Sequence, residues 1–260
     1  MEGEKVVEII SIGEELLIGK VVNTNASWIA RRIAELGGKV RRIITVGDNT
    51  EEIISAIRDS VSRGTNIIIT TGGLGPTFDD KTMEAISKLT EKPLKLDMEV
   101  LKGIEEKVRK RGRKISDSAR KMAYVPEGSK ILHNSIGTAP GIMIEYENAI
   151  IIALPGVPSE MEAMFNDQVI KIVKTEHKLL EREFIIYGVP EAVLAPTVIE
   201  IMKEIPNIYI KTHPKMELGE RPVLRLHMYS REYEWEAWEE IVERVKGKIM
   251  EIHKCEVQEA

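Results

Sequence analysis

The sequence predicts an α/β protein: a three-layer α/β/α domain with a mostly parallel sheet, followed by a small α+β domain. Short β-branched runs alternate three times with amphipathic helical patterns between residues 5 and 71. These runs are apolar on both faces, as strands are when helices cover both sides of a parallel sheet. Beyond residue 180 the order changes to strand, helix, strand, strand, helix, which is typical of a separate α+β unit.

The elements of the first domain follow from the apolar spacing and from the glycines and prolines that end each run. The run at 67–69 is a continuous β-branched stretch, whereas the isoleucines between residues 53 and 57 share one helical face. The expected elements are strand 5–12, a helix ending at Gly37, strand 40–46, helix 50–62, strand 67–69, a mainly helical stretch over 79–123 that Pro93 interrupts, strands 142–144 and 149–154, and helix 158–178.

A charged stretch at 181–183 marks the boundary to the second domain, so we expect domains over 1–178 and 181–260. The expected elements here are strand 183–189, helix 191–204, strands 207–212 and 222–229, and helix 232–252. The last helix has apolar residues at spacings of 3, 4, 3, 4 and 3: Trp235, Trp238, Val242, Val245, Ile249 and Ile252. Such a stripe faces a core, so both tryptophans are predicted to be core anchors.

Composition excludes several classes of protein. The 260 residues carry one cysteine and a net charge of −5 that is spread evenly along the chain. A single cysteine excludes an intrachain disulfide scaffold and indicates a reducing compartment. Neither an apolar run of about 18 residues nor a basic leader is present, so we expect a cytoplasmic protein without a membrane partner. No half of the chain is basic, so nucleic acid is not expected as a partner. Only two glutamines occur, which is typical of a thermophile that is rich in Ile, Lys and Glu.

The segment from Thr70 to Thr82, TTGGLGPTFDDKT, joins the third strand to a helix. Ligands of open α/β sheets bind beyond the carboxyl ends of the strands, which is where this segment begins. Gly72, Gly73 and Gly75 let backbone N–H groups approach a ligand closely, and the helix N-terminus that follows favours an anion. The segment contains neither a Walker A loop nor a complete GxGxxG motif, so it predicts an anion site of another kind.

Two acids, Asp79 and Asp80, follow the glycines within this segment. Carboxylates in a first helical turn ordinarily stabilise the helix by about 0.3–1 kcal/mol, and that explanation is one alternative. Beside an anion cradle, however, two carboxylates repel a phosphate unless a cation lies between them. A divalent ion such as Mg²⁺, bound by one or two carboxylates and by the phosphates of the ligand, resolves this conflict. Asp48 ends the second strand near the same edge, where its alternative role is to cap the helix at 50–62.

Further candidates for ligand binding share a position in loops at the ends of predicted strands: Glu14, Asn23 and Asn25 after the first strand, Thr77 and Thr82 after the third, Gly137, Thr138 and Gly141 before the fourth, and Pro155 and Gly156 after the fifth. Each loop alone is an ordinary turn, but together they supply donors from more than one side of a cleft. The five histidines show no metal-ligand spacing, and no Gly-x-Ser-x-Gly elbow occurs. Hydrolysis by a nucleophilic Ser or Cys is therefore not expected.

Six motifs, in order, resemble the CinA family (competence/damage-inducible protein A): GEELLIG at 13–19, VNTNA at 22–26, VGD at 46–48, TGGLGPTFDD at 71–80, GTAPG at 137–141 and LPGVP at 154–158. The resemblance implies a molybdopterin-binding domain like those of MoaB and Mog. The segment 181–255 is similar to the KH-like small domain of CinA proteins, but it contains no Gly-x-x-Gly loop that would indicate RNA binding. The nicotinamide-mononucleotide deamidase domain of bacterial CinA proteins does not follow, so its activity is not expected here.

The resemblance further implies a metal-dependent pyrophosphohydrolase that acts on a dinucleotide-type substrate such as ADP-ribose. Asp48, Asp79 and Asp80 match the acidic, metal- and phosphate-handling positions of the superfamily and are the expected catalytic residues. Asp79 and Asp80 would hold the divalent cation, which is Mg²⁺, Mn²⁺ or Co²⁺. The loop of Gly72, Gly73, Gly75 and Thr77 would cradle the pyrophosphate, and a homodimer is the expected assembly.

Two alternatives stay open. One is a protein of molybdenum cofactor biosynthesis that binds molybdopterin or transfers a nucleotidyl group to it, with the same loops holding the pterin phosphate. The other is a non-catalytic partner of a separate deamidase. Lys121 is a candidate phosphate contact, but Met122 stands where bacterial relatives tend to have glutamine. A nucleotide or a pterin is thus the expected small-molecule partner.

Overall fold

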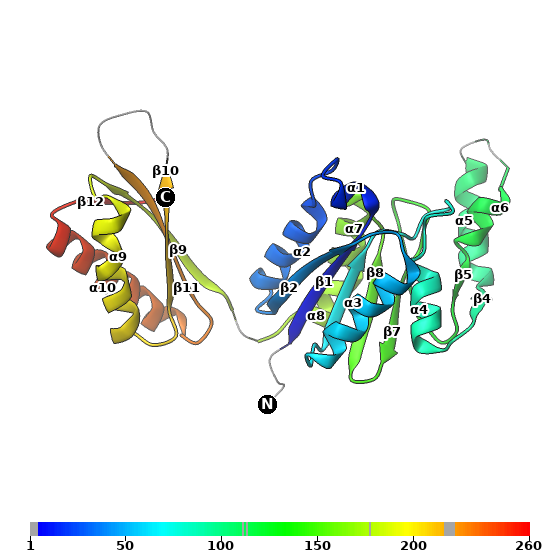
Figure 1. The fold of residues 1–260 in the computed structure, drawn as a ribbon, viewed down its shortest axis with the longest axis horizontal. Coiled ribbons are helices and arrows are strands. Elements are labelled where there is room, and N and C mark those ends of the chain that lie inside the picture. The colour runs from blue at the N-terminus through cyan, green and yellow to red at the C-terminus, as the bar shows by residue number, and fades with distance from the viewer. Residues whose placement is uncertain (1–4, 111, 113, 177, 216–221) are drawn as a thin grey trace. The chain divides into compact units, whose positions relative to one another are not determined.

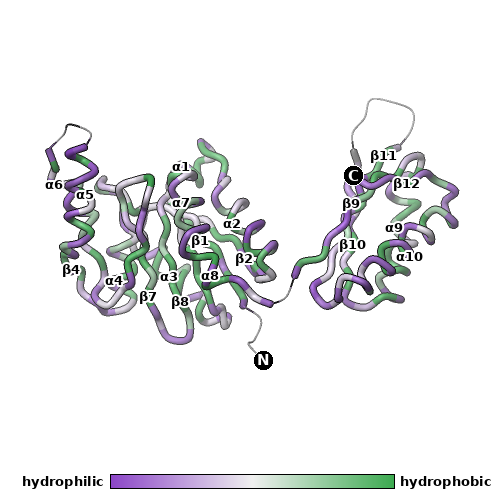
Figure 2. The backbone as a smooth tube through the Cα atoms, turned by 180° about the vertical axis from the view of Figure 1, so that it is seen from behind, coloured by the Kyte–Doolittle hydropathy of each residue, from purple (hydrophilic) through white to green (hydrophobic). Residues whose placement is uncertain are grey.

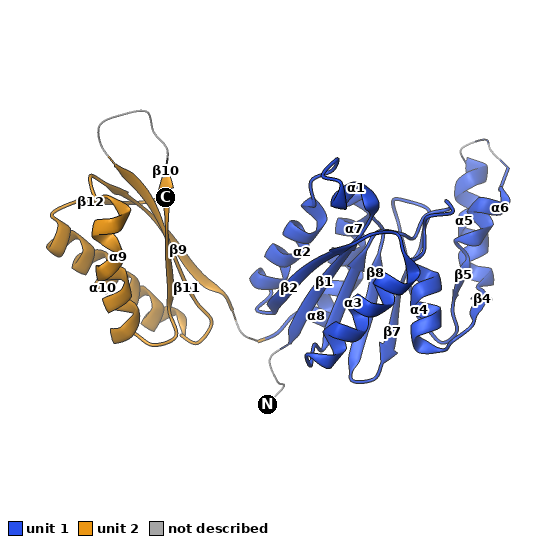
Figure 3. Cartoon of the chain, viewed as in Figure 1, with its two compact units in different colours: residues 1–175 blue, residues 176–260 orange. Residues whose placement is uncertain are grey.

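The computed structural model describes residues 5–110, 112, 114–176, 178–215 and 222–260. The chain divides into two units, Met1–Thr175 and Glu176–Ala260 (Figure 3), each with its own sheet and its own core. The first four residues of the domain predicted over 1–178, and His177 in its predicted last helix, lie outside the described residues.

Strands and helices alternate along the first half of the first unit (Figure 1). Its strands are β1 (Val6–Ile12), β2 (Lys39–Val46), β3 (Ile67–Thr71), β4 (Leu94–Leu96), β5 (Tyr124–Pro126), β6 (Lys130–Leu132), β7 (Gly141–Tyr146) and β8 (Ala149–Leu154). Its helices are α1 (Glu14–Leu17), α2 (Thr24–Glu35), α3 (Thr50–Ser62), α4 (Thr82–Thr90), α5 (Met98–Lys110), α6 (Asp117–Lys121), α7 (Pro158–Met164) and α8 (Ile170–Val173), the last two joined by the π-helical turn η1 (Phe165–Val169).

The main sheet has the strand order β2-β1-β3-β8-β7-β6. β1 is parallel to β2 and β3, and β3 to β8, whereas β7 is antiparallel to β8 and β6. Helices α3, α4 and α5 bury apolar residues against one face, and α2, α7 and α8 against the other. The predicted three-layer arrangement with a mostly parallel sheet is confirmed. Ser11 is paired with Thr71 and Thr71 with Leu154, so β1, β3 and β8 end together at one edge.

Among the described residues of the first unit, one charged residue is fully buried inside this core. Glu8 of β1 is fully buried, and its carboxylate accepts hydrogen bonds from Arg63 Nε at 3.1 Å, Arg63 Nη2 at 2.6 Å and Ser60 Oγ at 2.8 Å. Burial alone would raise the pKa of Glu8, but the bonds from Arg63 and Ser60 outweigh it, so the pKa lies below its ordinary value. The pair joins β1 to the end of α3.

The stretch predicted to be mainly helical over 79–123 also contains one strand, β4, and two further short strands, β5 and β6, follow it. β4 begins directly after Pro93 and pairs with β5 in a separate two-stranded antiparallel sheet. Strands of three residues, β6 among them, are too short to show a period of two, which is why none of the three was predicted. The helix predicted over 158–178 begins at Pro158 as expected, but its last helical residue is Val173.

The second unit consists of β9 (Leu180–Tyr187), α9 (Glu191–Glu204), β10 (Tyr209–Lys215), β11 (Val223–Ser230), α10 (Trp235–His253) and β12 (Glu256–Glu259). The strands form one antiparallel sheet in the order β10-β11-β9-β12. The predicted order is thus extended by β12, a four-residue strand with one apolar residue, Val257, that carried no sequence signal. The resulting βαββαβ order is that of ferredoxin-like units.

Apolar and polar residues alternate along α10 (Figure 2), and the helix packs on its sheet through Trp238, Val242, Val245 and Ile249. The prediction of a core anchor is right for Trp238, which is fully buried, and wrong for Trp235, which is 53% exposed. Trp235 is the first residue of the helix, and its ring stacks with the Arg182 guanidinium at 5.4 Å. None of the helices in the described ranges has the length and apolarity needed to cross a membrane.

Candidate functional site

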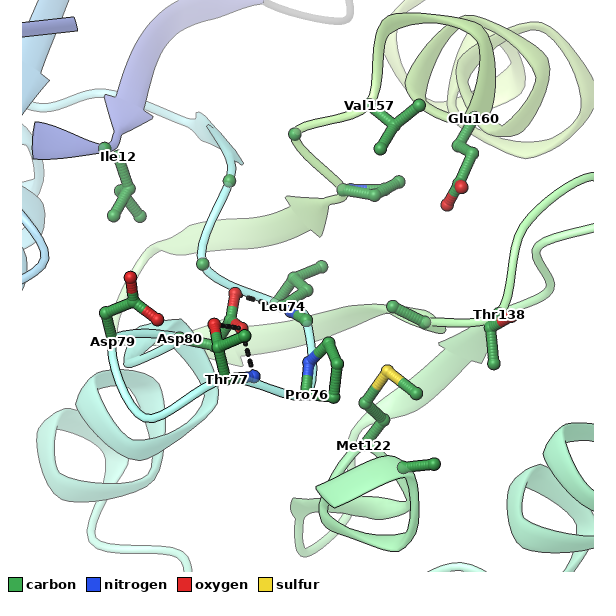
Figure 4. A pocket seen from close by; sticks show the side chains of 18 of the residues that line it. Ile12, Leu74, Pro76, Thr77, Asp79, Asp80, Met122, Thr138, Val157 and Glu160 are labelled. Atoms are coloured by element: carbon green, nitrogen blue, oxygen red, sulfur yellow. Dashed lines mark hydrogen bonds between the residues drawn. The ribbon is translucent and has the colours of Figure 1, made fainter. Parts of the chain in front are cut away.

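A cavity of about 640 Å³ opens where β1, β3 and β8 end (Figure 4). The loops that follow these strands line one side of it. The opposite wall comes from the segment between β4 and β5: Val108, Lys114, Ser116, Ala119 and Met122. Glu160 of α7 and the loop residues Thr138 and Ala139 complete the lining. Small-molecule sites have volumes of about 300–1,000 Å³, so the cavity has the size of a ligand site.

The glycines after β3 are held against their neighbours too tightly for any side chain. Gly72 has a φ of 107°, and a Cβ there would lie 2.1 Å from the carbonyl oxygen of Ile12. Gly73 has a φ of 66°, and its Cβ would lie 2.3 Å from Thr82 Oγ1. Thr82 is fully buried and donates its hydroxyl proton to the Gly72 carbonyl at 2.8 Å. Thr82, a predicted ligand contact, therefore lies behind the loop and supports it.

Asp80 holds the next part of the loop in place. Its carboxylate accepts hydrogen bonds from the backbone N–H groups of Gly75 and Thr77, both at 2.7 Å, and from the Thr77 hydroxyl. Lys121 of α6 donates from Nζ to the carbonyls of Thr77 at 2.6 Å and of Asp80 at 2.9 Å. Lys121 is thus placed beside the predicted site, although in this arrangement its ammonium binds the loop.

Asp79 is the exposed member of the acidic pair. Figure 4 shows its carboxylate beside the cavity, on the side of Ile12. Hydrogen bonding by the Thr77 side chain, and the charge of Lys121, lower the pKa of Asp79 from its ordinary value. The Thr77 hydroxyl has one proton and also lies within hydrogen-bonding distance of Asp80, so it donates to one of the two carboxylates at a time. Because its pKa is lowered, Asp79 is ionised at neutral pH, and its exposed carboxylate is available to a cation.

Asp48 reaches the same cavity from the end of β2. Burial raises its pKa above the ordinary value, and the charges of Glu15, Asp79 and Asp80 add to this, while a hydrogen bond from the Glu14 N–H opposes it. The alternative role of Asp48 as the cap of α3 is excluded, because Asn49 accepts from the Glu51 and Glu52 N–H groups. Asp48 instead closes the start of α1, where the Glu14 N–H donates to it at 2.8 Å.

Among the described residues that line the cavity, five carry carboxylates and one carries an ammonium: Glu15, Asp48, Asp79, Asp80 and Glu160 against Lys114. Over the part of the chain that the structure describes, no three His, Cys, Asp or Glu side chains are grouped so as to hold a metal ion by themselves. The donor set fits a hard divalent cation only if the ligand supplies further oxygens, which is the usual way in which Mg²⁺ is bound with phosphates.

The remaining predicted residues take several positions. Thr77, Thr138, Pro155 and Gly156 line the cavity, whereas Glu14, Gly137 and Gly141 do not. Asn23 caps α2 through the Ala26 N–H at 3.2 Å, and Asn25 donates to Thr71 Oγ1 at 2.9 Å and to the Gly156 carbonyl at 2.8 Å. Both asparagines line a smaller cavity of about 110 Å³ that shares Ile12, Glu15 and Gly156 with the larger one. They join the loops rather than face the main cavity.

Sequence reasoning did not select Glu15, Lys114, Ser116, Met122 or Glu160 as site residues. For Glu15 a signal existed, because it follows the glycine that ends the first strand. The others come from helices and connections whose approach to the cavity depends on tertiary packing. No periodicity along the chain reveals such an approach.

The chain is similar to several known proteins. The family described as "Probable molybdopterin binding domain" matches residues 8–175. A protein of Pyrobaculum arsenaticum is 41% identical over 250 residues, which cover 95% of this chain and 94% of the relative. A protein of Sulfurisphaera tokodaii is 43% identical over 253 residues, which cover 96% of this chain and 95% of the relative. The crystal structure of "the protein CinA with unknown function" from Thermoplasma acidophilum is similar with a TM-score of 0.60 and 36% identity, over 65% of this chain and 98% of that one.

Proposed function

Because the chain belongs to the CinA family, with a molybdopterin-binding domain over residues 8–175, we propose that its cavity binds a phosphorylated pterin or a similar nucleotide-like molecule. The observation that carries the proposal is that one cavity is lined both by a glycine loop, whose backbone N–H groups favour an anion, and by carboxylates, which favour a cation. A ligand with a phosphate at one end and a ring at the other satisfies both, provided that a cation accompanies the phosphate.

The chain contributes three things to such a ligand. In the loop from Gly72 to Gly75, which Thr82 and Asp80 fix from behind, the Gly72 N–H donates to the Leu154 carbonyl and the Gly75 N–H to Asp80. The N–H groups of Gly73 and Leu74 would be the donors to a ligand, in a loop that needs no reorganisation on binding. Asp79 and Asp48 would hold a divalent cation, which supplies the positive charge that lets a phosphate lie among carboxylates. The apolar wall around Met122 and Ala119 would cover the ring of the ligand.

Calorimetric titration with neopterin monophosphate, in Mg²⁺ and then in EDTA, tests the proposal. We expect binding in Mg²⁺ that weakens at least about tenfold in EDTA and in Asp79→Asn, because the phosphate then meets uncompensated carboxylates. Asp167→Asn is the matched control, since Asp167 is exposed on η1 and does not line the cavity. Equal affinity with and without the metal, or in Asp79→Asn, would contradict the role given to the carboxylates.

A second candidate function is metal-dependent hydrolysis of a dinucleotide-type pyrophosphate such as ADP-ribose. The raised pKa of Asp48 favours it, because a carboxylate with a raised pKa is a better general base towards water. The cation would activate that water and neutralise the pyrophosphate, with Asp48, Asp79 and Asp80 around it.

This second candidate is separated from binding alone by its products. The protein would be incubated with ADP-ribose and with FAD in Mg²⁺, Mn²⁺ or Co²⁺, and release of AMP would be followed by chromatography. Hydrolysis predicts AMP that disappears with EDTA and in Asp48→Asn. Binding of neopterin monophosphate without any AMP release would leave the first function in place and exclude the second for these substrates.

A further inference from the structure

Glu160 is the one carboxylate of the cavity that lies away from the glycine loop. It projects from the first turn of α7, and Figure 4 places it across the cavity from Asp79 and Asp80, with its carboxyl group turned into the open space. A carboxylate in this position does not meet the phosphate end of a ligand held by the loop after β3. It meets the opposite end.

Buried groups hold this carboxylate in one place. Asn134 is 2% exposed, and its Nδ2 donates to Glu160 Oε2 at 2.7 Å and to the Ala139 carbonyl at 2.8 Å. Its Oδ1 accepts from the backbone N–H groups of Gly137 at 2.6 Å and of Ile136 at 3.2 Å. The Asn134 amide therefore uses both its protons and both its lone pairs. Its orientation is determined, and with it the orientation of Glu160.

Gly137 makes room for the same group. A Cβ at position 137 would lie 1.9 Å from Cδ and from Oε2 of Glu160, so any side chain there displaces the carboxylate. Lys107 of α5 fixes this part of the loop by donating from Nζ to the carbonyls of Gly137, at 2.7 Å, and of Asn134. Glycine at 137, like the buried Asn134, thus has a role in the placement of Glu160.

The carboxylate retains capacity for further hydrogen bonds. An ionised carboxylate has about four lone-pair sites, and the described residues make one hydrogen bond to Glu160, the bond from Asn134. Val157 lies beside Glu160 in Figure 4, and the apolar side chains of Met122 and Ala119 line the same cavity. A planar ring packed against these apolar side chains would turn an edge to Glu160, and the edge that a carboxylate accepts best is a pair of adjacent N–H donors.

We propose that Glu160 determines specificity by accepting two hydrogen bonds from the edge of a 2-amino-4-oxo ring, the arrangement that pterins and guanine share. Such a ring presents a ring N–H next to an exocyclic amino group. Adenine presents a bare ring nitrogen there, whose lone pair faces the carboxylate. The inference rests on the proposed function, since it assigns the ring end of the ligand whose phosphate the glycine loop binds.

Titration with GDP, IDP and ADP in Mg²⁺ tests the assignment, because the three differ only in the ring. We expect GDP to bind at least about tenfold more tightly than ADP, with IDP between them, since hypoxanthine keeps the ring N–H and lacks the amino group. Glu160→Gln removes the charge at constant size. This substitution should weaken the binding of GDP at least about tenfold and leave the affinity for ADP unchanged. Neopterin monophosphate compared with GMP distinguishes a pterin from a guanine ligand.

Gly137→Ala provides an independent test. In the wild-type background it should reduce the preference for binding GDP over ADP. In a Glu160→Ala background it should not change this preference, since there is then no carboxylate to displace. Thermal melts of all variants separate this from misfolding. Binding of all three nucleotides with equal affinity, or a Glu160→Gln effect of equal size on each, overturns the assignment of Glu160 alone. Binding of none of the nucleotides and of neither pterin nor GMP overturns the proposed function together with it.

Discussion

The Asp48 carboxylate accepts a hydrogen bond of 2.8 Å from the backbone N–H of Glu14, and so connects the loop after β2 to the loop after β1. The same carboxylate is the one whose pKa is raised by burial and by neighbouring acids. A single side chain therefore supports the edge of the cavity and carries a charge that the cavity disfavours. A charge of this kind is retained at the expense of stability when a cation or a catalytic role requires it.

Asp48→Asn is expected to stabilise the metal-free protein at neutral pH by about 1 kcal/mol or less. The folded pKa of Asp48 lies above the unfolded value, so its contribution is most favourable below the unfolded pKa of about 3.9 and is lost as the pH rises through the folded pKa. Asparagine still accepts from the Glu14 N–H without that cost. Urea unfolding in EDTA, between acidic and neutral pH, measures the difference in the free energy of unfolding between Asp48→Asn and the wild type. This difference should shrink towards low pH.

Glu8→Gln is expected to destabilise the first unit by about 3 kcal/mol, near the lower limit for a broken buried pair, because 25% of the Arg63 side chain reaches solvent. Here the folded pKa is lowered, so the stabilisation is present above the unfolded pKa of about 4.3 and is lost as the pH falls through the folded pKa. Denaturant unfolding as a function of pH measures both the loss of stability in Glu8→Gln and its dependence on pH. The exposed Glu145→Gln in β7 is the control, with a change within about 0.5 kcal/mol.

Gly72→Ala is expected to cost about 2–5 kcal/mol, the sum of an unfavourable positive φ and a steric contact with the Ile12 carbonyl. Gly64→Ala isolates the first contribution. Gly64 has a φ of 74° and nothing within 4 Å of its Cβ, so about 1–2 kcal/mol is expected there. Thermal unfolding of the two variants under one condition compares them. Equal losses would mean that the loop after β3 relaxes away from β1.

Lys121→Met is expected to weaken neopterin monophosphate binding by about tenfold while changing stability by less than about 1 kcal/mol. The exposed ammonium holds the Thr77 and Asp80 carbonyls and lowers the pKa of Asp79, so its loss disorders the loop and not the core. Lys102→Met on the exposed face of α5 is the matched control. Calorimetry with a parallel thermal melt separates the two effects. A large loss of stability without a loss of affinity would contradict this role.

The central strands β1, β3 and β8 were predictable because they are buried on both faces, so that Ile67–Thr71 is apolar or β-branched at every position. The strands β4, β5 and β6 were not, since three residues show no periodicity. In the second unit the apolar stripe of α10 predicted correctly that Trp238 is buried and wrongly that Trp235 is buried. A stripe indicates which face of the helix packs on the sheet, but not how far along the helix the sheet extends. Asp79 and Asp80 lie before α4, which begins at Thr82, because the Asp80 side chain binds the Gly75 and Thr77 N–H groups of the preceding loop, and spacing does not reveal these bonds.

The cavity was predictable on one side only. The loop of Gly72 to Asp80 follows a strand of a parallel sheet, and that topology places it at the edge where β1 and β8 also end. Glu160 and Met122 come from helices whose approach to this edge is a result of packing. Thr82 and Lys121 were identified by position, but their hydrogen bonds to backbone carbonyls of the loop appear only in three dimensions.

The sheet of the second unit has a consequence for the order of events during protein synthesis. β9 begins at residue 180 and lies between β11 and β12, and β12 begins at residue 256. A ribosome that adds about 5–20 residues per second needs roughly 4–15 seconds to make the chain between them. During that time all strands of the first unit have been synthesised, while the edge of β9 that pairs with β12 has no partner strand. A nascent chain at this stage is open to strand pairing with another copy, and it is here that protection by a chaperone would matter most.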